Sequence, residues 1–439
     1  MNTLQTTIFN LIDAALHQKT GANNSVPQDI KRAGSSPVSK ATDAQDTDWD
    51  AILTELENQA VIGIPLEYMI NNTDAPQEQK DHWTNIVYSQ VAQWTKIIEA
   101  QNDLIQLLNK NGIKLAIIKG ITAAMNYPKP DYRSMGDVDF FVDESDFNRT
   151  YELMTQNGYS LAGDESIAQM HVEKEKYHHI ELMKNGVTFE LHRRMSDTVQ
   201  GKETDQKIEA MIQEGMNHIE IGRVGTYEFP MFEKKLNGLI ILRHIIQHIG
   251  QSKGVGLRHV IDWMTFVEKN VDDDAWRAEF ESYLDAVDLK VAAIVFARIG
   301  QLYLGMDESI EWCKGVVDDE NAATDVQAKT NLDTLCQQWI EQIMEQGNFG
   351  KKQTEADQGA SVLYKNKNIF TMIGSLQGLG MQHWEAARKH KALRPLAWAY
   401  QAGRYARKGL GRKNPIKSLK SDMDKSNYKK ELLKGLKID

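Results

Sequence analysis

The sequence predicts an α+β fold, with a small mixed β-sheet embedded in mostly helical N- and C-terminal regions. Apolar residues recur at helical spacing through residues 48–111 and again after about residue 234. Within residues 112–232, short apolar runs are separated by glycines and Asn-Gly pairs, which is typical of strands joined by turns. A chain of 439 residues is too long for one simple core, so we expect two or three domains.

Five parts follow from these patterns. They are an N-terminal helix and polar linker (1–47), an N-terminal helical region (48–111), an α/β core (112–232), a helical domain (233–345) and a C-terminal helical and basic tail (346–439).

Helices are predicted on both sides of the N-terminal linker. Ile8, Leu11, Ile12 and Leu16 have the spacing of an amphipathic helix, and the polar residues 19–47 favour a loop. A second helix is expected after Asp48. A long one is expected over 79–110, where apolar residues keep helical spacing until Asn111-Gly112 stops it.

The α/β core is expected to alternate strands and short helices. We assign KLAIIKG (114–120) to a buried strand, ITAAMNY (121–127) to a short helix, GDVDFFVD (136–143) to the next strand and ESDFNRTYELMTQNGY (144–159) to a helix. Residues 176–194 form two runs joined by Asn185-Gly186, the strongest short signal for a β-hairpin.

Amphipathic helices dominate again after about residue 234. Two i, i+4 pairs stand out there. His244 and His248 match a zinc-binding spacing, but no HExxH acid accompanies them, so we interpret them as core-packing residues. Arg258 and Asp262 predict an ion pair along one helix, with a nucleotide contact as the alternative.

Several features favour a cytoplasmic localisation. Cys313 and Cys336 cannot form a disulfide framework, which fits a reducing compartment. The N-terminus lacks a basic segment followed by a long apolar run, so we expect no signal peptide. No stretch reaches the roughly 18 apolar residues of a membrane span, so we expect no transmembrane segment.

Charge is distributed unevenly along the chain. Residues 388–439 hold 16 Lys and Arg against four Asp and Glu, a net charge of +12. The whole chain carries −10, so the preceding residues carry −22. A basic tail of this kind is either solvated, docked on the acidic body, or a patch for a polyanion such as a nucleic acid or an anionic membrane surface.

Asp137 and Asp139 are the first candidates for chemistry. Side chains alternate faces along a strand, so these two carboxylates point the same way, about 7 Å apart, while Val138 and Phe140 point the other way. Like charges this close repel unless a cation lies between them. Mg²⁺ prefers such carboxylates, with water and phosphate oxygens completing its coordination.

The predicted hairpin supplies a third carboxylate. A two-residue turn at Asn185-Gly186 pairs Lys184 with Val187, and Glu181 then faces Glu190. One face of the hairpin is apolar, and the other carries His179, Glu181, Glu190 and His192. Two glutamates in register repel each other, and a cation-binding face would relieve this repulsion.

These motifs resemble a known family. The segment IIKGITAAMNYPKPDYRSMGDVDFFV and the later YHHIEL and VTFELHRR are similar to the bacterial family of uncharacterised nucleotidyltransferases, within the polymerase-beta-like nucleotidyltransferase superfamily. The resemblance extends into the helical flanks and covers roughly residues 48–310.

The resemblance implies a role for each matching residue. Asp137 and Asp139 would be catalytic metal ligands, with Glu190 as the third carboxylate. Gly120 stands where the superfamily's Gly-Ser opens a helix that receives the triphosphate, and Thr122 stands in for the serine hydroxyl. Lys119 and Arg133 are the nearest cations for phosphate charge. The chain departs from the pattern by having Lys-Gly-Ile-Thr in place of Gly-Ser.

We therefore expect a metal-dependent nucleotidyltransferase. It would use Mg²⁺ or Mn²⁺ and a nucleoside triphosphate, with ATP favoured, to transfer a nucleoside monophosphate to a hydroxyl or phosphate acceptor and release pyrophosphate. The acceptor would be a small molecule or a macromolecule. Two alternatives remain open. One is a degenerate nucleotide-binding or scaffold protein, and the other is an RNA-end-modifying transferase that uses the basic tail, which the acidic body disfavours.

Overall fold

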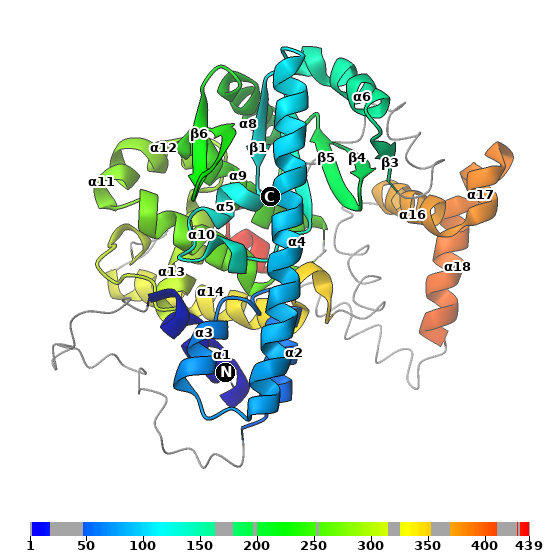
Figure 1. The fold of residues 1–439 in the computed structure, drawn as a ribbon. Helices are drawn as coiled ribbons and strands as arrows, with labels where there is room; N and C mark the ends of the chain where they lie inside the picture. Colours follow the sequence, from blue (N-terminus) through cyan, green and yellow to red (C-terminus); the bar gives the residue numbers. More distant parts are fainter. Residues whose placement is uncertain are drawn as a thin grey trace.

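A computed structural model describes residues 2–17, 47–162, 179–195, 200–251, 254–314, 325–352, 369–410, 428 and 431–438. Nearly all of the polar linker expected over 19–47, the start of the run 176–194, and much of the basic tail lie outside the described residues. The predicted fold class is confirmed, because a seven-stranded mixed sheet lies among helices that precede and follow it in the chain (Figure 1).

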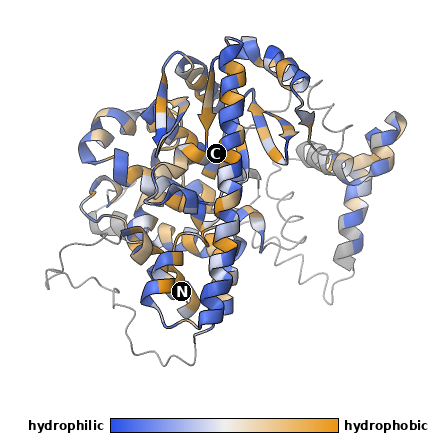
Figure 2. Cartoon of the chain, viewed as in Figure 1, coloured by the Kyte–Doolittle hydropathy of each residue, from blue (hydrophilic) through white to orange (hydrophobic). Residues whose placement is uncertain are grey.

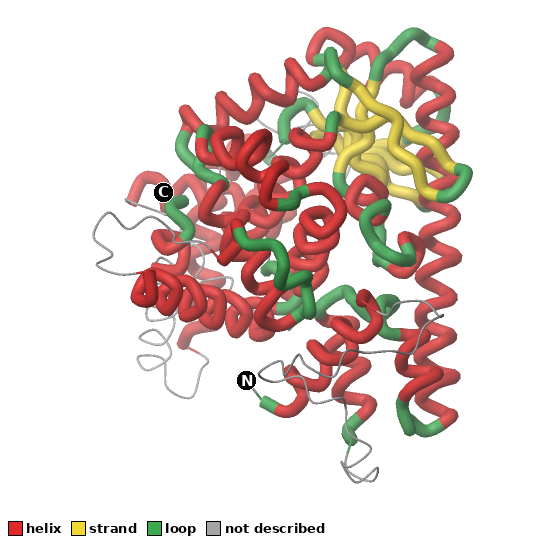
Figure 3. The backbone as a smooth tube through the Cα atoms, turned by 90° about the vertical axis from the view of Figure 1, so that its left-hand side faces the viewer, coloured by secondary structure: helices red, strands yellow, loops and turns green. Residues whose placement is uncertain are grey.

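The described residues before the sheet form four helices. They are α1 (Thr3–His17), α2 (Trp49–Asn58), α3 (Leu66–Asn72) and α4 (Gln77–Lys110). The 34-residue α4 runs from these helices past the sheet along one side of the molecule (Figures 1 and 3). The face predicted for α1 is buried at Ile8, Leu11 and Ile12.

The sheet has the strand order β3-β4-β5-β2-β1-β7-β6. Its strands are β1 (Leu115–Ile118), β2 (Asp137–Val142), β3 (Ser160–Leu161), β4 (His179–Lys184), β5 (Val187–His192), β6 (Ile219–Val224) and β7 (Tyr227–Phe232). The elements between them are α5 (Gly120–Ala124), η1 (Pro130–Tyr132), η2 (Glu144–Asp146), α6 (Phe147–Gln156) and α8 (Lys202–Gly215). β2 pairs antiparallel with β1 and parallel with β5, which makes the sheet mixed.

The predicted register of the β4–β5 hairpin is confirmed. Lys184 lies opposite Val187, and Glu181 lies opposite Glu190. Asn185 and Gly186 have φ values of 53° and 72°, as a type I′ turn requires at both central positions. A second hairpin, β6–β7, and the short β3 extend the two ends of the sheet and were not singled out from the sequence.

Helices follow the sheet. They are α9 (Lys234–Gln251), α10 (Leu257–Asn270), α11 (Asp273–Ala275), η3 (Trp276–Phe280), α12 (Glu281–Asp285), α13 (Lys290–Tyr303), η4 (Trp312–Lys314), α14 (Asp325–Gln346), η5 (Asn348–Gly350), α16 (Ile369–His383), α17 (Glu385–Lys389), η6 (Lys391–Leu396) and α18 (Ala397–Leu410). Among the helices that the structure describes, none is both long and apolar enough to cross a bilayer.

Each face of the sheet packs against its own core. Val138 and Phe140 of β2 join a smaller core with residues of α4 and α6, whereas Phe141 joins the larger core of the helical part. Figure 2 shows hydrophobic residues concentrated in the strands and mixed with hydrophilic ones along α4. Because faces alternate along a strand, Asp137 and Asp139 lie on the side of Phe141, toward the later helices.

Candidate active site

The structure brings the three predicted acids together. In the parallel β2–β5 pair, Asp139 lies directly beside Glu190, and Asp137 lies one pleat earlier on the same face of the sheet. All three side chains line one cleft of about 490 Å³. Its other walls come from the loop before β2, from α9 and α10, and from η5.

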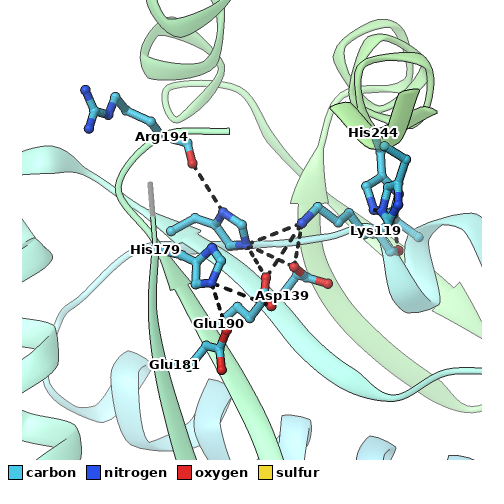
Figure 4. A network of polar contacts seen from close by, with 10 residues as sticks. Lys119, Asp139, His179, Glu181, Glu190, Arg194 and His244 are labelled. Carbon is cyan, nitrogen blue, oxygen red and sulfur yellow. Dashed lines mark hydrogen bonds and ion pairs between the residues drawn. The ribbon is translucent and has the colours of Figure 1, made fainter. Parts of the chain in front are cut away.

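Lys119 is a buried cation among these acids (Figure 4). Its Nζ lies 2.7 Å from Asp139 Oδ1 and 3.8 Å from Glu190 Oε2. Burial lowers the pKa of Lys119, but Asp139 and Glu190 outweigh that effect and raise it, so the ammonium group stays charged. The Lys119 backbone has a φ of 56°, a conformation that L-residues adopt only under strain.

His192 is a second buried partner of the acids. Its Nε2 lies 2.9 Å from Asp139 Oδ1 and 3.2 Å from Glu190 Oε2, and its Nδ1 lies 3.2 Å from the carbonyl of Arg194. Burial and Lys119 lower the pKa of His192, but the hydrogen bonds to the two carboxylates raise it overall. His192 therefore holds Asp139 and Glu190 in place from behind the cleft.

His179 extends the network toward solvent. Its Nε2 lies 3.3 Å from Glu181 Oε1 and 3.8 Å from Glu190 Oε1 (Figure 4). The pKa of Glu190 falls well below its usual range: burial raises it, but the His192 hydrogen bond and the charge of Lys119 outweigh burial. Glu190 is therefore ionised at neutral pH.

Asp137 differs from its two neighbours. Within the described part of the chain, its carboxylate forms no hydrogen bond and no ion pair. Burial, Asp139 and Glu190 together raise the pKa of Asp137 to about 7. A cation bound beside Asp137 would remove this repulsion, and carboxylate oxygens are hard donors of the kind that Mg²⁺ and Mn²⁺ prefer.

Gly120 and Thr122 occupy different environments. Gly120 lines the cleft at the start of the five-residue α5, and a Cβ there would lie 2.9 Å from Met135 Sδ, so a side chain would not fit without a shift. Thr122 is fully buried, its hydroxyl donates to the carbonyl of Lys119 at 2.8 Å, and it is not part of the cleft lining.

Arg133 lines the cleft and is also held from behind. Its Nε and Nη2 donate to the two oxygens of Asp262 at 2.6 and 2.7 Å, and the Tyr127 hydroxyl donates to the same carboxylate. The predicted helix pair between Arg258 and Asp262 is therefore wrong, because a bidentate arginine from another segment takes the carboxylate. Arg258 Nη1 instead donates to the carbonyl of Ser134, and its side chain also lines the cleft.

The cleft lining also includes residues that were not selected from the sequence. Lys351 and Phe349 come from the segment after α14, and Gln247 comes from α9. No local pattern marks these residues, because they reach the cleft from positions far from the Asp-x-Asp motif.

His244 and His248 line the cleft and meet His259 of α10, which the sequence analysis missed. One nitrogen from each of the three rings lies within 4.8 Å of the others. Burial is the main reason that the pKa values of His244 and His259 fall well below their usual value, so both rings are neutral. The N–H of Gly256 donates to His259 Nδ1 at 3.3 Å, and Phe349 packs on the rings of His248 and His259.

Comparison with known proteins gives a family match. A family model described as "Uncharacterised nucleotidyltransferase" matches residues 45–305, more than half of the chain. The match includes the three acids, Lys119 and Arg258, and it ends before Phe349 and Lys351. No curated protein matches the chain.

Proposed function

Because the chain belongs to the uncharacterised nucleotidyltransferase family, we propose that it is a metal-dependent nucleotidyltransferase. Membership of this family indicates a general role in nucleotidyl transfer. In the proposed reaction, a nucleoside monophosphate, with AMP from ATP as the first candidate, passes to a hydroxyl or phosphate acceptor. The single observation that carries the proposal is the meeting of Asp137, Asp139 and Glu190 in one open cleft.

The three carboxylates would hold Mg²⁺ or Mn²⁺. A bound cation would stabilise the ionised form of Asp137 most, because burial and the two neighbouring carboxylates raise its pKa. When bound, such an ion neutralises phosphate charge and lowers the pKa of an attacking hydroxyl. Lys119 and His192 hold Asp139 and Glu190 in fixed positions, which favours a preformed site.

Cations on the cleft walls suit a triphosphate. Lys119, Arg133, Arg258 and Lys351 all line the same cleft as the acids. The charge of Arg133 is balanced by Asp262, which leaves Arg258 and Lys351 as the cations we assign to phosphate oxygens. Gly120 lines the cleft and has no side chain of its own, which would let the phosphates approach its backbone.

The chemical step is a displacement at the α-phosphorus. The acceptor oxygen forms a bond to this phosphorus as the bond to the bridging oxygen of the β-phosphate breaks, and pyrophosphate leaves with that oxygen. A carboxylate of the acidic set accepts the proton that the acceptor hydroxyl loses.

The test is transfer of label from each of the four α-³²P-labelled nucleoside triphosphates, with Mg²⁺ or Mn²⁺ and an extract that supplies acceptors. We expect label to enter a small molecule, a protein or an RNA, and the transfer to fall at least about 100-fold in Asp137→Asn and Asp139→Asn, as for the loss of an essential electrostatic group. Asp143→Asn removes an acid beyond the end of β2, outside the cleft lining, and should leave transfer unchanged.

Two results separate the alternatives. Nucleotide binding without label transfer under any condition would favour the degenerate nucleotide-binding protein. Label entering RNA ends, with RNA binding that falls as salt rises and is lost on deletion of residues 388–439, would favour the RNA-modifying transferase.

A further inference from the structure

Phe349 is an exposed aromatic residue inside the cleft. It lies in η5, and 53% of its surface is accessible, although large apolar side chains are usually buried. It lines the same cleft as the three acids. An exposed aromatic ring at a cleft that also contains a charged cluster suits a ligand with a flat apolar part and an anionic part.

The backbone at Phe349 is strained. Its φ and ψ are 54° and 26°, in the left-handed region that a bulky residue rarely adopts. Such strain persists only where the surrounding structure fixes it, and it is common at ligand-binding positions.

Close packing fixes this segment against the start of α10. A Cβ at Gly254 would lie 2.3 Å from the backbone nitrogen of Gly350, and one at Gly256 would lie 2.6 Å from Cβ of Asn348. Two glycines are therefore required for this approach. Asn348, which packs against Gly256, is 2% exposed.

Two lysines after Phe349 fasten the same segment to α2. Lys351 Nζ donates to the carbonyl of Glu57 at 3.1 Å, and Lys352 Nζ pairs with the carboxylate of Glu55 at 2.9 Å. Lys352 also donates to the carbonyl of Met344 at the end of α14. The segment that carries Phe349 is thus attached to three separate helices.

Neighbouring side chains set the orientation of the ring. His248 and His259 meet it in edge-to-face geometry, with centroids 4.9 and 6.1 Å away. The guanidinium carbon of Arg258 lies 5.4 Å from the centroid. These contacts orient the ring, while 53% of the surface of the residue stays accessible.

We propose that Phe349 is the platform on which the nucleobase of the substrate stacks. This inference rests on the proposed function, because it assigns the base of the same nucleotide whose phosphates meet the acids. Stacking on an aromatic face tolerates every base but favours the larger purines. Phe349 also lies outside the family match over residues 45–305, so the match assigns it no role.

The experiment measures binding without turnover. Calorimetry with Mg²⁺ compares two ligands, the α,β-methylene analogue of ATP, whose α–β linkage cannot be cleaved, and inorganic tripolyphosphate, which has no base. Phe349→Ala should weaken binding of the ATP analogue about tenfold and leave tripolyphosphate binding unchanged. Phe349→Trp should bind the ATP analogue as tightly as the wild type does, because it keeps an aromatic face. Tyr88→Ala is the control, since Tyr88 is 62% exposed on α4 and is not part of the cleft lining.

Each outcome decides between the two proposals. Equal binding of the analogue by wild type and Phe349→Ala would overturn the stacking proposal alone. An equal loss for both ligands in Phe349→Ala would also overturn it, because it would mean that the segment supports the cleft without contacting the base. Wild-type protein that binds neither this analogue nor those of the other three nucleotides would overturn the proposed function as well.

Discussion

Asp137 and Asp139 are two residues apart on one strand, yet their surroundings differ. Asp139 is 5% exposed, and its carboxylate contacts both Lys119 and His192. Asp137 has no such partner within the described residues, and burial beside Asp139 and Glu190 raises its pKa to about 7. The strand thus carries one carboxylate that is paired with cations and one that forms no ion pair with any described residue.

This difference predicts how Asp137→Asn alters stability. The pKa of Asp137 rises from 3.8 to about 7 on folding, so its contribution to stability is present below pH 3.8 and is lost as pH rises through about 7. Without metal at pH 8, Asp137→Asn should therefore melt at or above the wild-type temperature. Saturating Mg²⁺ should raise the melting temperature of the wild type and have less effect on the variant.

Differential scanning fluorimetry in EDTA and in Mg²⁺ checks this prediction. Asp143→Asn serves as the control and should keep the full response to Mg²⁺. A variant that melts well below wild type in EDTA, or that keeps the Mg²⁺ response, would contradict the assignment of Asp137 as a cation ligand.

At the scale of elements, the acidic cluster depends on two strand pairings. The β4–β5 hairpin sets which residues of β5 face the cleft, and the parallel β2–β5 pairing places Asp139 beside Glu190. A shift of one residue in either pairing would turn Glu190 toward the core of α4 and α6. The apolar residues Phe189 and Leu191, which fill that core, oppose such a shift.

The N-terminal helix α1 contains a pH-sensitive contact. His17 at its end is within hydrogen-bond distance of Asp13 Oδ1 at 2.9 Å and Glu268 Oε1 of α10 at 3.1 Å. Burial lowers the pKa of His17, but the hydrogen bonds to Asp13 and Glu268 raise it overall from 6.5 to about 9. The protonated side chain therefore ties α1 to the helical part.

The raised pKa predicts a loss of stability at alkaline pH. The contribution of His17 is complete below pH 6.5 and is lost as pH rises through about 9. His17→Gln should lower the free energy of unfolding by roughly 1–3 kcal/mol at pH 6 and have little effect at pH 10.

Urea unfolding across this pH range measures the effect. His218→Gln, at a side chain that is 62% exposed, is the matched control and should follow wild type at every pH. If the free energies of unfolding of wild type and His17→Gln run parallel as functions of pH, protonation of His17 does not contribute to stability and the prediction is wrong.

At the scale of the whole molecule, the C-terminal end returns to the body. Leu432 and Leu436 are 2% and 0% exposed and belong to the larger core with the helices after the sheet. Close contact requires a glycine between them, because a Cβ at Gly435 would lie 2.8 Å from Leu335 Cδ1. The last part of the basic tail is therefore docked, which fits one of the interpretations based on charge.

Docking of this end predicts a stability effect far from the cleft. Leu436→Ala should lower the free energy of unfolding by about 2–4 kcal/mol, the usual loss for a buried leucine. Lys434→Ala changes a side chain that is 66% exposed and should alter it by less than about 0.5 kcal/mol. Equal stability of both variants in urea unfolding would mean that the end does not pack as described.

Much of the fold and part of the site could be predicted from short stretches of sequence. Asn185-Gly186 set the hairpin, and the alternation along residues 137–142 placed Asp137 and Asp139 on one face. The β6–β7 hairpin could also have been predicted from the sequence, because Gly225 begins a two-residue turn between Val224 and Tyr227. These features follow from neighbours in the chain.

The rest of the site depends on contacts between distant segments. Arg133 could have paired with several acids, and only the approach of α10 gives it Asp262 and leaves Arg258 to the cleft. Lys119 meets Asp139 and His192, and Phe349 meets Arg258, across separate elements. No periodic pattern in the sequence indicates which of these distant residues come into contact.

The sequence by itself thus determined the strands β1 and β2, the β4–β5 hairpin and the face on which the acids lie, since backbone geometry and turn chemistry act over a few residues. Only the tertiary structure decided which cations neutralise which acids and which aromatic ring enters the cleft. Those choices are made by packing between segments that lie tens to hundreds of residues apart, where steric fit and burial of charge select one arrangement among many that the local patterns allow.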